Sequence, residues 1–193
     1  STTITDYAWS GTFGPGADLL FETSYGQVEF VGNAADTNVA VFEQWVHSVS
    51  VDGFSAEILT FEQGAHSVST GRNGDSVTAE GYVGSLDTGN GGDVVTFLEN
   101  AGAGTVDLGI GDDLATFSGW VNALDAGRGV DTVVFNGSAG ANLVDLGDGT
   151  GAGTESLTTG GWINEIVQGN GSAAVSLTAG AGAVSLGGGA DSL

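Results

Sequence analysis

The chain has 193 residues, of which 24 are Asp or Glu and only 2 are Lys or Arg, so its formal net charge is −22. This charge excludes nucleic-acid binding by phosphate neutralisation and argues against binding to an anionic membrane surface. The absence of cysteine excludes disulfides and thiolate metal sites. No apolar run is long enough for membrane insertion. With 36 Gly, one Pro and 40% hydrophobic residues, the chain resembles neither collagen nor an acidic disordered tail.

A glycine recurs along the chain at steps of 18 to 22 residues, which indicates a repeat architecture. An acid stands four residues after eight of these ten glycines, more often than its share of the chain explains. The glycines are Gly14, Gly32, Gly53, Gly71, Gly89, Gly109, Gly127, Gly147, Gly169 and Gly187. The acids are Asp18, Asp36, Glu57, Asp75, Asp93, Asp113, Asp131 and Asp191, with Gly151 and Ala173 in the two remaining repeats.

Hydrophobic positions keep the same spacing. The repeats are looser in residues 1–60, regular in residues 61–193, and interrupted by an insertion near 151–156. Columns six and eight residues after the glycine have the two-residue spacing of a strand face. The column three residues before it is Val68, Leu86, Val106, Leu124, Val144, Ile166 and Val184. The column six residues after it includes Leu20, Val77, Val95, Ala115, Val133 and Val175, and the column eight residues after it includes Phe97, Phe117, Phe135 and Leu177.

These spacings predict an all-β fold, a parallel β-roll or β-solenoid of about ten turns of roughly 18–20 residues. Each turn has two short strands and two glycine-rich corners, and the aliphatic columns fill the interior of a single domain, 1–193. An antiparallel β-sandwich also suits short strands with glycine turns, but it does not predict an acid at one fixed phase of the repeat.

Stacked turns place the repeat acids, from Asp18 to Asp131, above one another about 4.8 Å apart. Two such charges repel by roughly 1 kcal/mol in water and by several times more at a lower effective dielectric constant. A bound cation removes this repulsion, and oxygen ligands without His or Cys favour Ca²⁺ over zinc or copper. The alternative is that the acids only favour turns.

Several segments resemble the nonapeptide G-G-x-G-x-D-x-U-x of the RTX (repeats-in-toxin, haemolysin-type calcium-binding) family. They are TGRNGDSVT from Thr70, TGNGGDVVT from Thr88, LGIGDDLAT from Leu108 and AGRGVDTVV from Ala126, with FGPGADLLF from Phe13 and LGGGADSL from Leu186. The resemblance implies a β-roll in which several Ca²⁺ ions bind in a row, and secretion through a type I system. It assigns the carboxylates to Asp18, Asp36, Glu57, Asp75, Asp93, Asp113, Asp131 and Asp191. It assigns backbone carbonyl ligands to Gly71, Asn73, Gly89, Gly91, Gly109, Gly111, Gly127 and Gly129.

The chain departs from the family pattern in ways that change this expectation. The first glycine of the nonapeptide is replaced, and the motif occurs once rather than twice in 18 residues. We therefore expect a degenerate variant with a single calcium row. Gly151 and Ala173 interrupt that row, so the stretch from Gly147 to Ala173 is expected to be poor in metal.

Three weaker patterns have alternative interpretations. The acids two residues before the repeat glycine are either additional calcium ligands or solvated residues on the outer side of a strand. A series of Thr residues is either an ice-binding surface or a consequence of the β-propensity of Thr on an outward-facing row. The residues that follow each repeat glycine are mixed, which does not favour a flat ice-binding surface. Tyr82, Trp120 and Trp162, near the corner without acids, stack on sugar rings or serve packing. The acids are Asp87, Asp107, Asp125 and Asp145, and the Thr series is Thr60, Thr78, Thr96, Thr116, Thr154 and Ser176.

Enzyme motifs are missing: the only imidazoles are His47 and His66, and no G-x-S-x-G or H-E-x-x-H occurs. The sequence predicts a secreted, extracellular, calcium-binding structural module of a bacterial surface protein such as an adhesin, S-layer protein or filament. The alternatives are the calcium-folding and export module of a type-I-secreted enzyme, or a polysaccharide- or ice-binding module. Both ends suggest an excerpt of a longer chain, and we expect open end turns that contact further turns or a second copy end to end.

Overall fold

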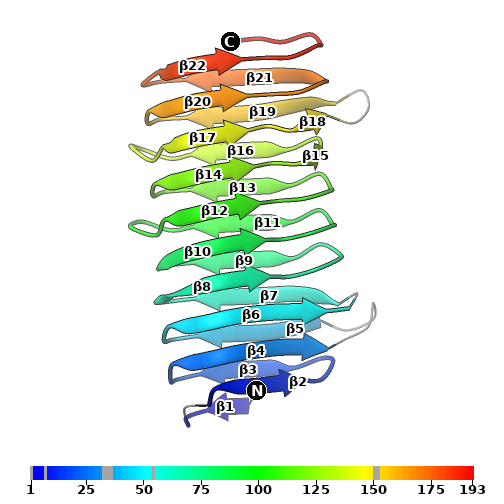
Figure 1. Ribbon diagram of the computed structural model, residues 1–193, viewed down its shortest axis with the longest axis vertical. Helices are drawn as coiled ribbons and strands as arrows, with labels where there is room; N and C mark the ends of the chain where they lie inside the picture. Colours follow the sequence, from blue (N-terminus) through cyan, green and yellow to red (C-terminus); the bar gives the residue numbers. More distant parts are fainter. Residues whose placement is uncertain (1, 7, 32–36, 54, 150–152) are drawn as a thin grey trace.

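The computed structural model describes residues 2–6, 8–31, 37–53, 55–149 and 153–193. It confirms the all-β, repetitive architecture: a parallel β-solenoid of about nine turns. Two ten-stranded sheets run along the stack, and successive strands of the chain, apart from β15 and β18, alternate between them. Figure 1 shows the turns stacked in sequence order, with the two termini at opposite ends. Every neighbouring pair of strands in the described residues is parallel, as a coil of stacked turns requires.

The strands are short because each turn contributes only one strand to each sheet. The first sheet contains β1 (Thr2–Ile4), β3 (Asp18–Phe21), β5 (Thr37–Phe42), β7 (Ala56–Phe61), β9 (Ser76–Ala79), β11 (Val94–Phe97), β13 (Leu114–Phe117), β16 (Thr132–Phe135), β19 (Thr154–Thr159) and β21 (Ser172–Leu177). The second contains β2 (Ser10–Phe13), β4 (Tyr25–Val31), β6 (Val46–Asp52), β8 (Gly64–Ser69), β10 (Tyr82–Asp87), β12 (Ala103–Asp107), β14 (Val121–Asp125), β17 (Ala141–Asp145), β20 (Ile163–Val167) and β22 (Ala181–Ser185). A small third sheet pairs β15 (Arg128–Gly129) with β18 (Asp148–Gly149).

The core is a set of side-chain columns between the two sheets. The predicted aliphatic column from Val68 to Val184 is in register across the second sheet. Fully buried phenylalanines form a second column on the first sheet: the rings of Phe21 and Phe42 stack with centroids 4.6 Å apart, and those of Phe117 and Phe135 stack at 5.0 Å. Because one turn alone buries little, these contacts between turns supply the hydrophobic stabilisation.

The two corners of each turn define two edges of the solenoid. At the acid edge, the chain passes from the second sheet to the first, as in residues 88–93. At the aromatic edge, it passes from the first sheet back to the second, as in residues 118–120. At the acid edge, Gly109 has a φ of +84°, and a Cβ there overlaps the carbonyl oxygen of Gly89 in the turn below. Only glycine fits that corner, because both the dihedral angle and the contact exclude a side chain.

The register differs from the sequence prediction in two places. In the first turn Leu19, not Leu20, aligns with the buried column, since Leu19 pairs with Ala40 and Ala40 with Leu59. After the insertion, Thr158 rather than Thr154 continues the Thr series, and Val134 interrupts that series. Counting from the repeat glycine fails at both places because the corner lengths vary.

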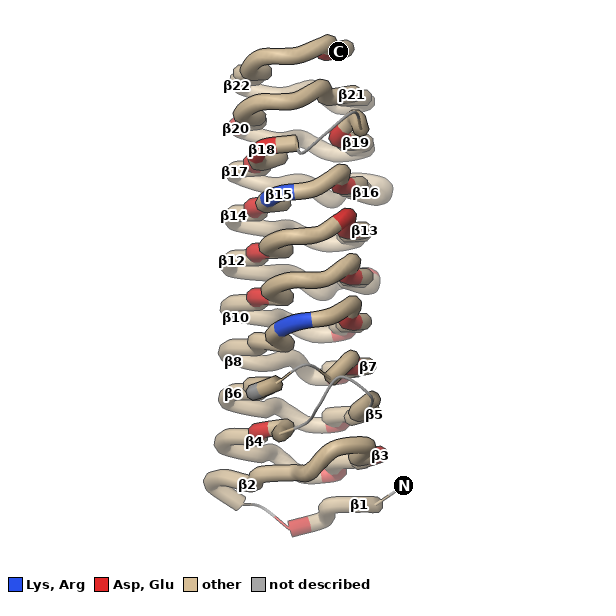
Figure 2. Tube along the Cα trace, turned by 90° about the vertical axis from the view of Figure 1, so that its right-hand side faces the viewer, with Lys and Arg blue, Asp and Glu red and all other residues tan. Residues whose placement is uncertain are grey.

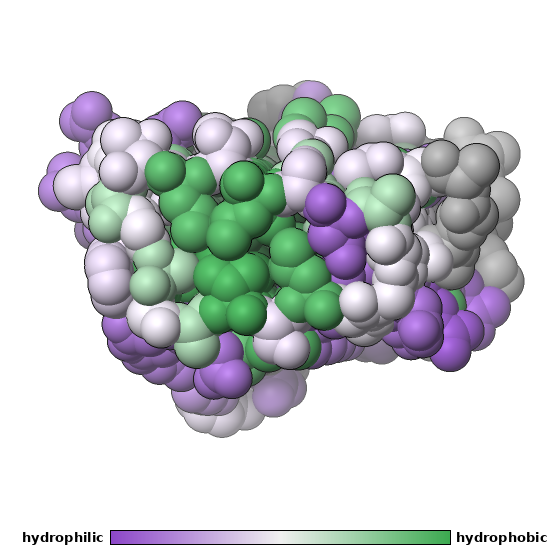
Figure 3. Space-filling model, turned by 90° about the horizontal axis from the view of Figure 1, so that it is seen from above, coloured by the Kyte–Doolittle hydropathy of each residue, from purple (hydrophilic) through white to green (hydrophobic). Residues whose placement is uncertain are grey.

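The C-terminal end of the stack exposes core-type residues. Figure 3, a view onto this end, shows apolar residues gathered in its centre. Leu177, Val184 and Leu186 pack on the core there but are only partly buried. Within the described residues, no helix is long and apolar enough to cross a bilayer.

Candidate metal site

Six acids form a column inside the acid edge, which we call the acid column. Register pairing aligns one acid in each of six consecutive turns. Each side chain is exposed by only 1–2%. Figure 2 shows acidic residues recurring from turn to turn along this side of the stack. The members of the acid column are Glu57, Asp75, Asp93, Asp113, Asp131 and Glu155.

One oxygen of each acid connects adjacent turns. Oδ1 of Asp93 accepts a hydrogen bond from the backbone N–H of Asp75 at 2.7 Å. Oδ1 of Asp113 accepts in the same way from the N–H of Asp93 at 2.7 Å, and Oδ1 of Asp131 accepts from the N–H of Asp113 at 2.9 Å. The pattern extends downward to the N–H of Glu57 and upward to Glu155, whose Oε2 accepts from Asp131 at 2.8 Å. The acids thus accept hydrogen bonds from buried backbone N–H groups that have no partner in the pairing between strands.

The second oxygen of every acid in the column is buried without a hydrogen-bond partner among the described residues. Burial, the largest cause, and neighbouring acids together raise the pKa of Asp75, Asp113 and Asp131 to about 7, and hydrogen bonds to the carboxylates oppose part of this shift. Burial likewise raises the pKa of Glu57, Asp93 and Glu155. An orphaned, ionised oxygen in such a place is costly, so it favours a proton or a cation.

The lower end of the column is closed by neutral groups. Asn38 aligns with Glu57, and its Oδ1 accepts from the N–H of Ala17 at 3.0 Å. Its Nδ2 donates to Oε1 of Glu57 at 3.1 Å, and the hydroxyl of Ser55 donates to the same oxygen at 2.6 Å. Glu57 therefore has two side-chain donors, whereas Asp75 and Asp93 each have one neighbouring hydroxyl, that of Thr70 or Thr88, which lowers the pKa of the carboxyl group.

The structure places one predicted acid outside the column and adds one acid that the sequence did not predict. Asp18 is exposed and lies outside the column, because Ala17 occupies the aligned position beside Asn38. Asp36 and Gly151 lie outside the described residues. The expected interruption after Asp131 is wrong for the acids, since Glu155 fills that level. Ala173 does leave a gap above Glu155, and beyond it Asp191 accepts a hydrogen bond from the N–H of Ala173 at 2.9 Å.

Sequence counting missed Asn38 and Glu155, although a signal for both was present. Each is the first of three buried residues at every second position of a strand. The first of the three is polar, and the second is small or aliphatic. Asn38, Ala40 and Phe42 follow it, as do Glu155, Leu157 and Thr159. Anchoring on this strand pattern, rather than on the preceding glycine, finds the whole column.

The predicted backbone ligands are engaged in the stack. The carbonyl oxygens of Gly71, Gly89, Gly109 and Gly127 each accept an N–H from the next turn at 2.8–3.0 Å. These carbonyl groups point along the stacking direction, so each oxygen has only one lone pair left for a cation. Asn73, Gly91, Gly111 and Gly129 lie in the same corners; Asn73 has a φ of +97°. Within the part of the chain that the structure describes, no three Asp, Glu or His side chains are arranged to hold a metal ion.

The acid column fits a hard cation in its donor chemistry. It offers one orphaned carboxylate oxygen in each of six turns, with no sulfur or imidazole beside it. The chain has only 2 Lys or Arg against 24 acids, so internal cations cannot neutralise the column. An ion there would have one side-chain ligand per turn and would need backbone carbonyls or water for its remaining ligands.

The second acidic series lies on the surface of the same edge. Asp87, Asp107, Asp125 and Asp145 are aligned by strand pairing at the ends of β10, β12, β14 and β17. Oδ1 of Asp125 accepts from the N–H of Gly127 at 2.9 Å, and Asp145 makes the same contact with Gly147. Partial burial and neighbouring acids raise the pKa of Asp107 and Asp125. Short local hydrogen bonds of this kind are typical of turn-forming aspartates.

No protein-family model, curated protein or solved structure matches the chain.

Proposed function

We propose that the chain is a calcium-stabilised structural module of a secreted bacterial surface protein. The observation that carries this proposal is the buried column of six acids, each with one oxygen that has no partner among the described residues. Secretion and a surface role rest on the resemblance of four central corners to RTX repeats. The regular stack, in which contacts between turns dominate, suits an extended spacer or scaffold.

In this proposal the acids hold both the turns and the ions. One oxygen of Asp93 or Asp113 keeps its backbone N–H partner, and the other faces the cation. Protons and Ca²⁺ compete for the second oxygen, because burial raises the pKa of these acids. Calcium bound to the folded chain and not to the unfolded chain increases the free energy of unfolding by mass action.

The test is a calcium titration followed by far-UV circular dichroism and thermal melting, starting from chelator-treated protein. We expect Ca²⁺ to produce or stabilise the β signal cooperatively at neutral pH. Asp93→Ala and Asp113→Ala should raise the calcium midpoint more than Asp148→Ala or Asp191→Ala, which change exposed acids. An unchanged spectrum and melting temperature in chelator contradicts the proposal, and equal effects of all four variants indicate bulk charge rather than ligation.

The exposed apolar end supports one further part of this proposal, contact between copies end to end. Leu177, Val184 and Leu186 pack against the core but are only partly buried. Light scattering of the 193-residue chain over a range of concentrations tests it. Strictly monomeric protein at high concentration in millimolar Ca²⁺ rules out this contact.

A further inference from the structure

The aromatic edge has a periodicity of two turns. The residue that begins or directly precedes each second-sheet strand is alternately an aromatic residue and a glycine over eight consecutive turns. In chain order these residues are Trp45, Gly64, Tyr82, Gly102, Trp120, Gly140, Trp162 and Gly180. We call the four aromatic residues the aromatic row.

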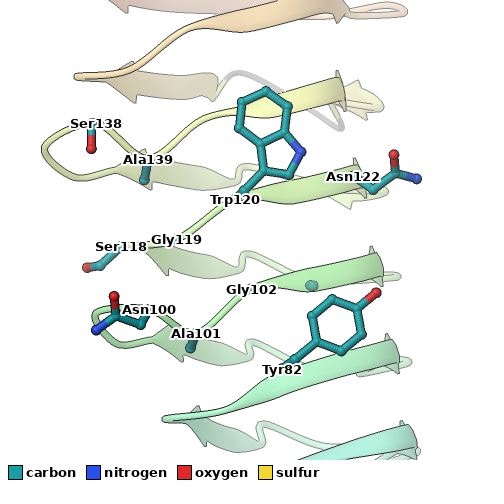
Figure 4. Close-up of a pocket in the computed structure, with 11 residues that line it drawn as sticks. Tyr82, Asn100, Ala101, Gly102, Ser118, Gly119, Trp120, Asn122, Ser138 and Ala139 are labelled. Atoms are coloured by element: carbon teal, nitrogen blue, oxygen red, sulfur yellow. The ribbon is translucent and has the colours of Figure 1, made fainter.

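The rings of the aromatic row are platforms on the surface rather than parts of the core. Trp45 is 39% exposed, Tyr82 53%, Trp120 46% and Trp162 47%. The glycines lie close to the rings: a Cβ at Gly140 would overlap the carbonyl oxygen of Trp162 and lie 3.2 Å from Cζ3 of Trp120, and one at Gly180 would make an ordinary contact of 3.4 Å with Cζ3 of Trp162. In Figure 4 the rings of Tyr82 and Trp120 project from the same edge two turns apart, with Gly102 at the level between them.

Amide side chains continue this surface onto the second sheet. Nδ2 of Asn142 donates to Oδ1 of Asn122 at 2.8 Å, and Nδ2 of Asn164 donates to Oδ1 of Asn142 at 2.7 Å. The indole N–H of Trp162 donates to Oδ1 of Asn164 at 2.8 Å, which fixes that ring beside the amides. Oriented rings and exposed amides together present both apolar faces and hydrogen-bonding groups.

A hollow of about 540 Å³ lies between two of these rings. Tyr82 and Trp120 line it together with Asn100, Asn122, Ser118 and Ser138, and none of its lining residues is charged. This lack of charge stands out in a chain with a net charge of −22. A surface of this kind suits a neutral, hydroxyl-rich ligand, and the surrounding negative field repels polyanions.

We propose that the aromatic row binds a neutral, extended β-1,4-linked polysaccharide. Rings two turns apart are about 9–10 Å apart, close to the length of one disaccharide unit of such a chain. Every second sugar therefore stacks its C–H face on Tyr82, Trp120 or Trp162. The hydroxyl groups of the intervening sugars reach the amides and serines of the hollow. Aromatic rings provide large contact area with little loss of side-chain entropy.

The test is titration of the full chain with cellohexaose, mannohexaose and chitohexaose, followed by tryptophan fluorescence and calorimetry. We expect at least one of them to bind, and Trp120→Ala or Trp162→Ala to weaken that binding roughly tenfold. The matched control is Trp9→Ala, because Trp9 is 66% exposed and lies outside the row. Circular dichroism confirms that each variant is folded.

Four outcomes overturn the proposal. The first is that none of the three neutral hexasaccharides binds. The second is that Trp9→Ala weakens binding as much as Trp120→Ala. The third is equal or tighter binding of maltohexaose, which is not extended, or of alginate, which is anionic. The fourth is that Trp120→Ala changes only the oligomeric state, which identifies a second copy of the chain as the occupant. The calcium proposal is unaffected by any of them.

Discussion

At both edges of the solenoid the chain reverses between the two sheets, but the two edges carry different kinds of side chain. At the acid edge, carboxylates are buried by 98% or more and hydrogen-bond directly to the next turn. At the aromatic edge, rings and amides face solvent, and the hollow between Tyr82 and Trp120 has no charged lining residue. The acid edge therefore holds the register of the stack, whereas the aromatic edge is free to carry a binding surface.

The largest expected difference between the edges is the pH dependence of the acid edge. In metal-free protein, the pKa of Asp75, Asp113 and Asp131 is raised from 3.8 to about 7. The unfolded chain therefore releases these protons at lower pH than the folded chain. The contribution of these acids to the free energy of unfolding should be fully present below about pH 4 and fall by several kcal/mol as the pH rises from about 4 to 7. Urea unfolding between pH 4 and 8 in chelator measures this fall, and a flat profile contradicts it.

A glycine substitution at each edge gives the next largest contrast. Gly109→Ala combines a φ of +84° with overlap on the backbone of the turn below, and should destabilise the protein by about 3 kcal/mol or more. Gly137, at the aromatic edge, has a φ of +59°, but a Cβ at this position meets nothing within 4 Å. Gly137→Ala should therefore cost only about 1–2 kcal/mol. Equal losses in urea unfolding indicate that the acid corners are not tightly stacked.

The sequence predicted the solenoid because its strongest signal, the column of apolar residues from Val68 to Val184, is also the physical cause of the fold. It located Asp75, Asp93, Asp113 and Asp131 because the corners before them have the same length. It misplaced Asp18 and missed Glu155, since corner length changes there while the strand pattern persists. The sequence placed Tyr82, Trp120 and Trp162 near the corner without acids, but their alternation with glycine and the fourth member, Trp45, become visible only when the strands are aligned.

Two substitutions at one position separate the two roles of a buried acid. At pH 5, where the carboxyl group is largely protonated, Asp113→Ala should cost about 1–3 kcal/mol because the N–H of Asp93 loses its acceptor. Asp113→Asn keeps that acceptor and should change stability by less than about 1 kcal/mol. At pH 8 in chelator, Asp113→Asn should be more stable than the unsubstituted chain, because it removes an ionised oxygen without a partner. Chemical unfolding at both pH values measures these differences.

The smallest expected effect belongs to the amide ladder of the aromatic edge. Asn142→Ala removes two hydrogen bonds, one to Asn122 and one from Asn164. All three side chains are exposed, so water replaces the lost partners, and the cost should be only about 0.5 kcal/mol. The measurement is the free energy of urea unfolding of Asn142→Ala and Asp113→Ala, compared at pH 5. A loss at Asn142 as large as that at Asp113 shows that the aromatic edge also holds the register. The division of roles between the two edges then fails.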